Sequence, residues 1–317
     1  MRVLRIQMPV QTNFFDTRLS TLEPLRVKTL QWLLPIVTLT LILTDGYWMS
    51  MNGAFVTAVA SSLILLMGIP HGTLDVEIAA HRFGQHDVRG KLIIVSTYCG
   101  GAAAMALLWM VAPSLALGLF LVLSIIHFGG DWRTDGDEFL GMTVGWALIS
   151  LPALSHPEAV AAIFETLTGD QNGATIAAIL ACTSIPAISG SLIFAAKAIK
   201  RADHVNGINV LSCLFAALLL PPLVGFAIFF CGLHSPRHLV EAIRQSGPMP
   251  YSEKLLRGTA VMALSLGAGA LLFATQRLIS LDAGIVRTAF VLLSILTVPH
   301  FFLEQLTDNR PANEGES

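Results

Sequence analysis

Long apolar runs that contain almost no charged residue limit the folds open to this chain more than any other feature. A helix needs about 20 apolar residues to cross the hydrocarbon core of a bilayer, and irregular backbone is not tolerated in contact with lipid. Charged residues make up 13% of the chain, whereas a soluble domain carries roughly 25%. The sequence therefore predicts an all-α fold, a polytopic transmembrane helical bundle.

The apolar runs predict about eight to ten transmembrane helices. The candidate segments are 30–49, 53–71, 91–111, 114–129, 139–155, 174–196, 207–220, 222–240, 256–275 and 284–306. Two of them, 114–129 and 207–220, are short for a span, which is why the expected count is a range. We expect a transmembrane domain at 30–306, a basic segment at 1–29 and a polar, disordered tail at 307–317.

Basic residues are distributed unevenly between the two sides of this topology. With ten spans, nearly all Lys and Arg residues fall in the set of loops that includes both termini. Cytoplasmic loops carry an excess of Lys and Arg, so both termini are expected in the cytoplasm. This pattern predicts a multi-pass protein of the inner (plasma) membrane. The sequence has no stripe of basic residues of the kind that indicates nucleic-acid binding, so no nucleic-acid partner is expected.

Five histidines lie near the cytoplasmic ends of predicted spans, at a similar depth. They are His71, His127, His234, His238 and His300. Ionisable residues inside a membrane are costly and mark functional sites. His234 and His238 are four residues apart, so on a helix both imidazoles share one face and can bind one metal ion. The plainer alternative is that these histidines hydrogen-bond backbone groups or lipid headgroups. The other four, His81, His86, His156 and His204, are expected in polar loops.

A carboxylate follows three of the five histidines at a spacing of four residues. The pairs are His71 with Asp75, His127 with Asp131, and His300 with Glu304. In a helix each carboxylate would lie one turn from its own histidine and accept its ring N–H, as metal-bound histidines usually require. The alternative, that the acids cap helix ends or face water, is equally open for Asp131. Imidazole suits Fe, Zn, Cu and Ni, so the sequence predicts a metal site between helices in the cytoplasmic half.

Glycine and proline gather beside the same histidines. They are Gly68, Pro70 and Gly72; Gly129 and Gly130; Gly232 and Pro236; and Pro299. These residues bend or end helices and allow close backbone approach. In a membrane, irregular backbone is tolerated only where protein or a cavity covers it. For Gly129 and Gly130, ordinary helix termination is a sufficient explanation.

Together, these motifs resemble the Brp/Blh-type bacterial and archaeal β-carotene 15,15′-dioxygenases, membrane enzymes that cleave β-carotene centrally into two retinal molecules. The resemblance covers about residues 53–306 and rests on the stretches 68–75, 127–131, 234–239 and 299–304. It implies a non-haem Fe(II) ion held by four histidines, which fall on His71, His127, His234 and His238. His300 matches a recurring Pro-His of the family and is expected, with Asp75 and Glu304, beside the ion as a pocket or orienting residue.

The resemblance also implies the substrates and partners. β-Carotene and O₂ are the expected substrates, the lipid bilayer is the surrounding medium, and retinal is expected to pass to a rhodopsin-type protein. A C40 hydrocarbon dissolved in the bilayer needs a site at membrane depth with lateral access. Aromatic side chains near the motifs, such as Phe128, Trp132, Phe229 and Phe230, suit either a polyene tunnel or ordinary core packing.

Other functions compete on the sequence alone. A histidine-box desaturase or hydroxylase uses more histidines, some of them adjacent, and none are adjacent here. A transporter or a proton or metal relay would place its residues across the membrane depth instead of at one level. A membrane cytochrome would place pairs of histidines on facing helices. Metal analysis distinguishes these alternatives, because the dioxygenase requires one iron and no haem absorption band.

Overall fold

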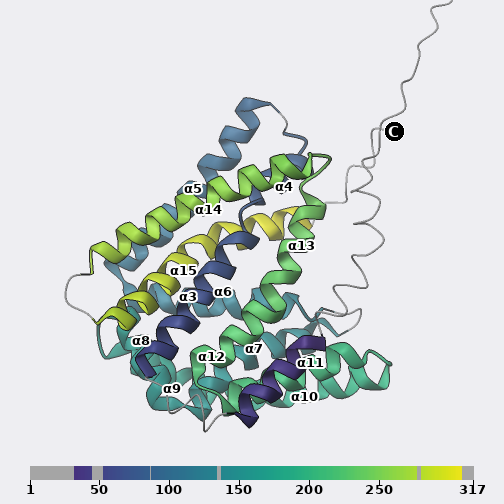
Figure 1. The fold of residues 1–317 in the computed structure, drawn as a ribbon, viewed down its shortest axis with the longest axis vertical. Coiled ribbons are helices and arrows are strands. Elements are labelled where there is room, and N and C mark those ends of the chain that lie inside the picture. The colour runs from purple at the N-terminus through teal and green to yellow at the C-terminus, as the bar shows by residue number, and fades with distance from the viewer. Residues whose placement is uncertain (1–31, 45–52, 86, 134–136, 277–279, 309–317) are drawn as a thin grey trace, which may run out of the picture.

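The computed structural model describes residues 32–44, 53–85, 87–133, 137–276 and 280–308, apart from the side chains of His71 and Asp308. Within these ranges the chain forms helices and no strand, which confirms the predicted all-α class (Figure 1). The expected basic segment at 1–29 and most of the expected polar tail lie outside the described residues. The last helix continues to Asp308, two residues beyond the predicted end of the membrane domain.

Among the described residues, the first element is a short apolar helix, Trp32–Leu43. The remaining elements are α3 (Gly53–His71), α4 (Asp75–Arg82), α5 (Val88–Val111), α6 (Pro113–Gly130), α7 (Glu138–Ser155), α8 (Pro157–Thr168), α9 (Asn172–Cys182), α10 (Ser184–Lys200), α11 (His204–Leu219), α12 (Pro222–Phe229), the π-helical turn η1 (Phe230–His234), α13 (Ser235–Gln245), α14 (Tyr251–Ala274) and α15 (Leu281–Asp308).

Among the described residues, seven helices are long and apolar enough to cross a membrane. The helices α9 and α10, bent by 44° relative to each other, make an eighth span if they are counted as one. The count is therefore seven without this pair and eight with it, and eight is the lower end of the predicted range of eight to ten. The two shorter apolar helices, Trp32–Leu43 and α11, coincide with the two remaining predicted spans.

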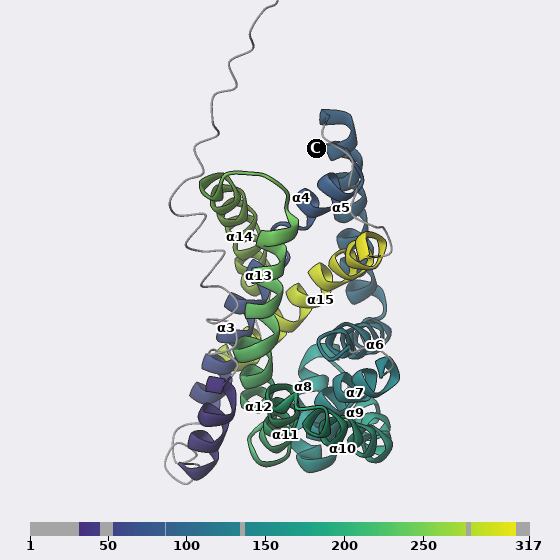
Figure 2. The same cartoon turned by 90° about the vertical axis from the view of Figure 1, so that its right-hand side faces the viewer.

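The helices form two groups that meet at α6 and α12 (Figures 1 and 2). α7, α9, α10 and α11 pack on one another, and α15 packs on α3 and α5. α6 contacts α5, α7 and α15, whereas α12 and η1 contact α3. The ends of α6, η1, α13 and α15 therefore approach one another, although they are far apart in the sequence.

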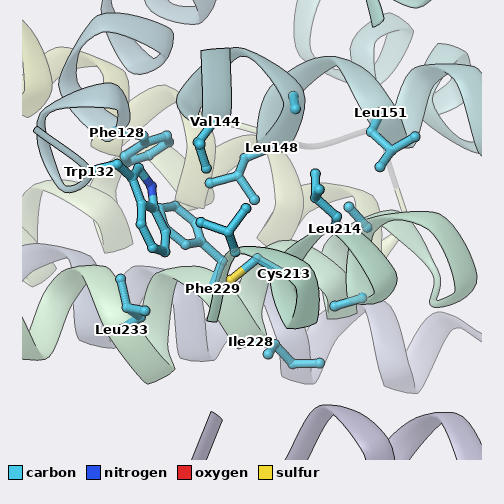
Figure 3. Close-up of a cluster of buried hydrophobic side chains, with 14 of the residues drawn as sticks. Phe128, Trp132, Val144, Leu148, Leu151, Cys213, Leu214, Ile228, Phe229 and Leu233 are labelled. Carbon is cyan, nitrogen blue, oxygen red and sulfur yellow. The ribbon is translucent and has the colours of Figure 1, made fainter. Parts of the chain in front are cut away.

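A buried apolar cluster supports this meeting point from the side of α7 and α11 (Figure 3). Phe128 and Phe229 meet edge to face with ring centroids 5.1 Å apart, and Trp132 meets Phe194 at 6.3 Å. Trp132 and Phe229 are almost completely buried, so the packing interpretation is the correct one for these two aromatic residues. The cluster fixes the end of α6, which carries His127.

α6 and α7 approach each other closely at glycine residues. A Cβ atom on Gly145 of α7 would lie 2.4 Å from the backbone nitrogen of Gly129 and 2.5 Å from the carbonyl oxygen of Ile125. A Cβ on Gly129 would meet the Cα of Met142 at 2.9 Å. Gly129 therefore allows the backbones of α6 and α7 to approach closely, in addition to its place near the end of α6.

Candidate metal centre

A π-helical turn places His234. The N–H of Ser235 donates to the carbonyl of Phe230, five residues earlier. Pro236 has no N–H, and in a regular α-helix its ring clashes with the carbonyl four residues earlier. The extra residue of a π turn accommodates this change, and such turns are frequent at functional sites. The Ser235 hydroxyl donates to the carbonyl of Met67, which ties this turn to α3.

Four of the five predicted histidines converge on one point. His127 comes from α6, His234 from η1, His238 from α13 and His300 from α15. The ring centroid of His127 lies 4.9 Å from His234 and from His238, and 5.2 Å from His300. The rings of His234 and His238 are 4.4 Å apart, which confirms that this pair shares a face.

The fifth histidine, His71, is the last residue of α3. Its side chain lies outside the described part of the structure, so its role as a ligand stays a prediction. Gly72, the next residue, lies close to the centre, because a Cβ there would be 3.6 Å from the Nδ1 atom of His300.

The carboxylates pair with histidines of other helices. Asp131 accepts from His234 (Oδ2 to Nδ1, 2.7 Å), Glu304 from His127 (Oε2 to Nδ1, 2.9 Å), and Asp75 from His300 (Oδ2 to Nδ1, 2.8 Å). The prediction that Asp131 and Glu304 serve the histidines four residues before them is wrong. Side chains one turn apart on a helix both point towards the facing helix. The histidine that each carboxylate contacts is therefore determined by how the helices pack.

These hydrogen bonds prepare the histidines for a metal. A carboxylate that accepts the Nδ1–H fixes the neutral tautomer whose Nε2 carries the lone pair, and it raises the basicity of that atom. His127, His234 and His300 all have this arrangement. His238 is turned the other way, since its Nε2 lies 3.2 Å from Asp131 Oδ1 and its Nδ1 lies 3.9 Å from Glu304 Oε1.

The donor set fits a transition-metal ion. Ligand atoms of His127, His234 and His238 lie within 4.8 Å of one another, and so do those of His127, His300 and Glu304. Imidazole nitrogen suits iron, zinc, copper and nickel, whereas magnesium and calcium require oxygen. The neighbouring carboxylates supply the negative charge that a divalent ion needs in a site of low dielectric constant.

Arg237 is a site residue that the sequence analysis missed, since it was counted only as a basic residue of a loop. Its Nη1 donates to the carbonyl of Asp131 at 3.3 Å and its Nη2 to Asn206 Oδ1 at 3.2 Å. The guanidinium also lies 5.5 Å from the ring centroid of Trp132. Arg237 thus holds in place the segment that carries Asp131. The position of Arg237 between His234 and His238 in the sequence could have indicated that it belongs to the site, because charged residues at membrane depth are usually functional.

An apolar cavity of about 600 Å³ adjoins the histidines. His127, His234 and His300 lie in its wall, which also includes the aromatic residues Phe128 and Phe230. Known ligand pockets measure about 300–1,000 Å³ and are mostly apolar. The charged lining residues, Glu77 and Arg257, form an ion pair with each other. The cavity therefore suits a large apolar molecule that reaches the histidines.

The histidines expected in loops are distributed differently from the prediction. His156 joins α7 to α8, whereas His81 lies within α4 and His204 begins α11. His81 and His204 are exposed at the surface, as expected. His86 lies outside the described residues.

The family follows from comparison with known proteins. The model of the family described as β-carotene 15,15′-dioxygenase matches residues 62–308, a range that includes every residue of the candidate metal centre. The chain belongs to the β-carotene 15,15′-dioxygenase family. Membership of the β-carotene 15,15′-dioxygenase family makes it a carotenoid dioxygenase, an oxidoreductase, and its apolar helices make it a multi-pass membrane protein.

One member of the β-carotene 15,15′-dioxygenase family is similar to this chain over most of the length of both proteins. The β-carotene 15,15′-dioxygenase of the uncultured marine bacterium 66A03 is 29% identical over 260 residues, which cover 77% of this chain and 91% of the relative. No solved structure matches this chain.

Proposed function

We propose that this protein cleaves β-carotene at its central 15,15′ double bond with O₂, giving two molecules of retinal, and that it uses Fe(II). The ligands are His71, His127, His234 and His238. The observation that carries the proposal is the convergence of imidazoles from α6, η1 and α13, two of which, His127 and His234, lie in the wall of an apolar cavity. Residues of a relay would be spread across the membrane, so this gathering at one point favours a catalytic metal.

The ion and the protein divide the chemistry between them. Fe(II) supplies the site at which O₂ is activated. Asp131 and Glu304 orient the ligand rings through the hydrogen bonds described above, and Asp75 does so for His300. The cavity walls hold the polyene beside the histidines and keep water away from the reacting double bond.

The cavity offers a route from the lipid. Its wall includes Val95 of α5 and Leu264 of α14, residues that are also 39% and 75% exposed on the molecular surface. Among the described residues of α14, only Ser265 and Gly269 are buried, so this helix is mostly exposed to its surroundings. A C40 hydrocarbon dissolved in the bilayer can therefore enter sideways between α5 and α14.

The location and the fate of the product belong to the same proposal. The uneven distribution of basic residues supports an inner-membrane protein with both termini in the cytoplasm. Reporter fusions after Lys91 and Lys254 should report the cytoplasm, and a fusion after Gln171 should report the opposite side. Retinal released into the membrane is expected to reach a rhodopsin-type protein.

The test is expression in a bacterial host that produces β-carotene, with pigments extracted and separated. The wild type should remove β-carotene and form retinal or retinol in a ratio of two per substrate. His127→Ala should leave the pigment intact, whereas His204→Ala, at an exposed position on α11, should behave as the wild type. Persistence of β-carotene with well-expressed, iron-loaded wild type would refute central cleavage.

A further inference from the structure

His300 has the same surroundings as the histidines proposed as ligands. It is buried on α15, and its Nδ1 lies 2.8 Å from Asp75 Oδ2. His127 and His234 each contact a carboxylate through Nδ1 in the same way, at 2.9 and 2.7 Å. A carboxylate at Nδ1 is the usual partner of a metal-bound histidine and directs Nε2 to the ion.

Relative to His127 and His238, the ring of His300 is placed as in ligands that share one ion. Imidazoles bound at about 2.1 Å to the same ion have ring centroids roughly 4.5 to 6.5 Å apart, for ligand angles between about 90° and 180°. The ring of His300 lies 5.2 Å from that of His127 and 6.2 Å from that of His238. Both separations fall inside this interval.

His300 also faces the place where the substrate would lie. Its side chain lines the same apolar cavity as His127 and His234, and its ligand atom lies within 4.8 Å of the ligand atoms of His127 and Glu304. Burying Asp75 is costly unless its charge is paired, and His300 is the imidazole that pairs with it.

We infer that His300 is a further ligand of the same metal ion as His127, His234 and His238. The described part of the chain then provides four imidazoles, and His71 would add a fifth. This inference rests on the metal centre of the proposed function, and it changes the role of His300 from a residue beside the ion to one bound to it.

The test uses cobalt binding instead of catalysis. Full-length protein, purified in detergent and freed of metal, is titrated with Co²⁺ alone, and the affinity and visible absorption spectrum are recorded. His300→Ala should weaken Co²⁺ binding more than 100-fold and change the spectrum, which imidazole added to the buffer should restore. Loss of an orienting partner costs about 10- to 100-fold, so Asp75→Asn should weaken binding within that range and retain the wild-type spectrum.

Two further variants serve as controls for nonspecific effects and for misfolding. His204→Ala removes an exposed histidine of α11 and should leave both the affinity and the spectrum unchanged. His300→Gln keeps a polar side chain of similar size in case the alanine variant folds poorly, and it should lose affinity in the same way. Wild-type affinity and spectrum in either folded His300 variant would overturn the inference. If the cobalt results hold but the wild type fails to cleave β-carotene, the proposed function fails and the ligand assignment stands.

Discussion

The closest helix contact of the site predicts the effect of a single methyl group. In Gly145→Ala the new Cβ would lie 2.4 Å from the backbone nitrogen of Gly129, whereas ordinary contacts begin at 3.4 Å. The neighbouring atoms are backbone and cannot rotate away, so α6 and α7 must separate by about 1 Å. Overpacking of this kind costs about 1–3 kcal/mol.

The displacement should reach the chemistry, because Gly129 lies two residues after His127. A misplacement of about 1 Å at a catalytic group can reduce the rate about 100-fold. We therefore expect Gly145→Ala to lower both the melting temperature and the rate of β-carotene cleavage, the latter by about 100-fold. Thermal unfolding in detergent and initial cleavage rates measure the two effects.

Gly130→Ala is the matched control. A Cβ at Gly130 has no atom within 4 Å, although this residue is also close to His127. Its stability should stay within about 0.5 kcal/mol of the wild type, as for surface substitutions. If Gly145→Ala retains the wild-type rate and iron content, the close contact of α6 and α7 does not position His127, and this reasoning is wrong.

Three other predictions follow, two from the contacts around the histidines and one from an ion pair away from the site. Arg237→Lys should lower iron affinity about 10- to 100-fold, because an ammonium cannot bridge two acceptors as the planar guanidinium does; unchanged iron content would contradict this. Asp131→Asn should reduce iron content more than Asp75→Asn, since among the described side chains Asp131 contacts two histidines and Asp75 contacts one. Metal analysis of the two purified variants compares them. Away from the site, the hydrogen bond from Lys197 lowers the pKa of Asp137, so its stabilising contribution is complete above the ordinary carboxylate pKa and is lost as the pH falls through the lowered value. Asp137→Asn should remove that part of the pH dependence of thermal unfolding.

The sequence alone was sufficient for the class of protein and for the gathering of histidines. Apolar runs of span length permit only helices in a membrane, and the structure contains them. The spacing of His234 and His238 determines that they share a face whatever the surrounding fold, since it depends only on helix geometry. Counting apolar residues also predicted a common depth for His127, His234 and His300, and the structure confirms that the rings of His234 and His300 both lie close to that of His127.

The tertiary structure alone decided which groups pair across helices. His127 meets Glu304 from 177 residues away, and His300 meets Asp75 from 225 residues away, whereas the local spacing had pointed to different partners. The contact of Gly145 with Gly129 and the bridge from Arg237 to Asp131 depend in the same way on how helices approach each other. Helical periodicity determines the face on which a side chain lies, but the partner on the facing helix depends on packing angle and depth, which no local pattern in the sequence specifies.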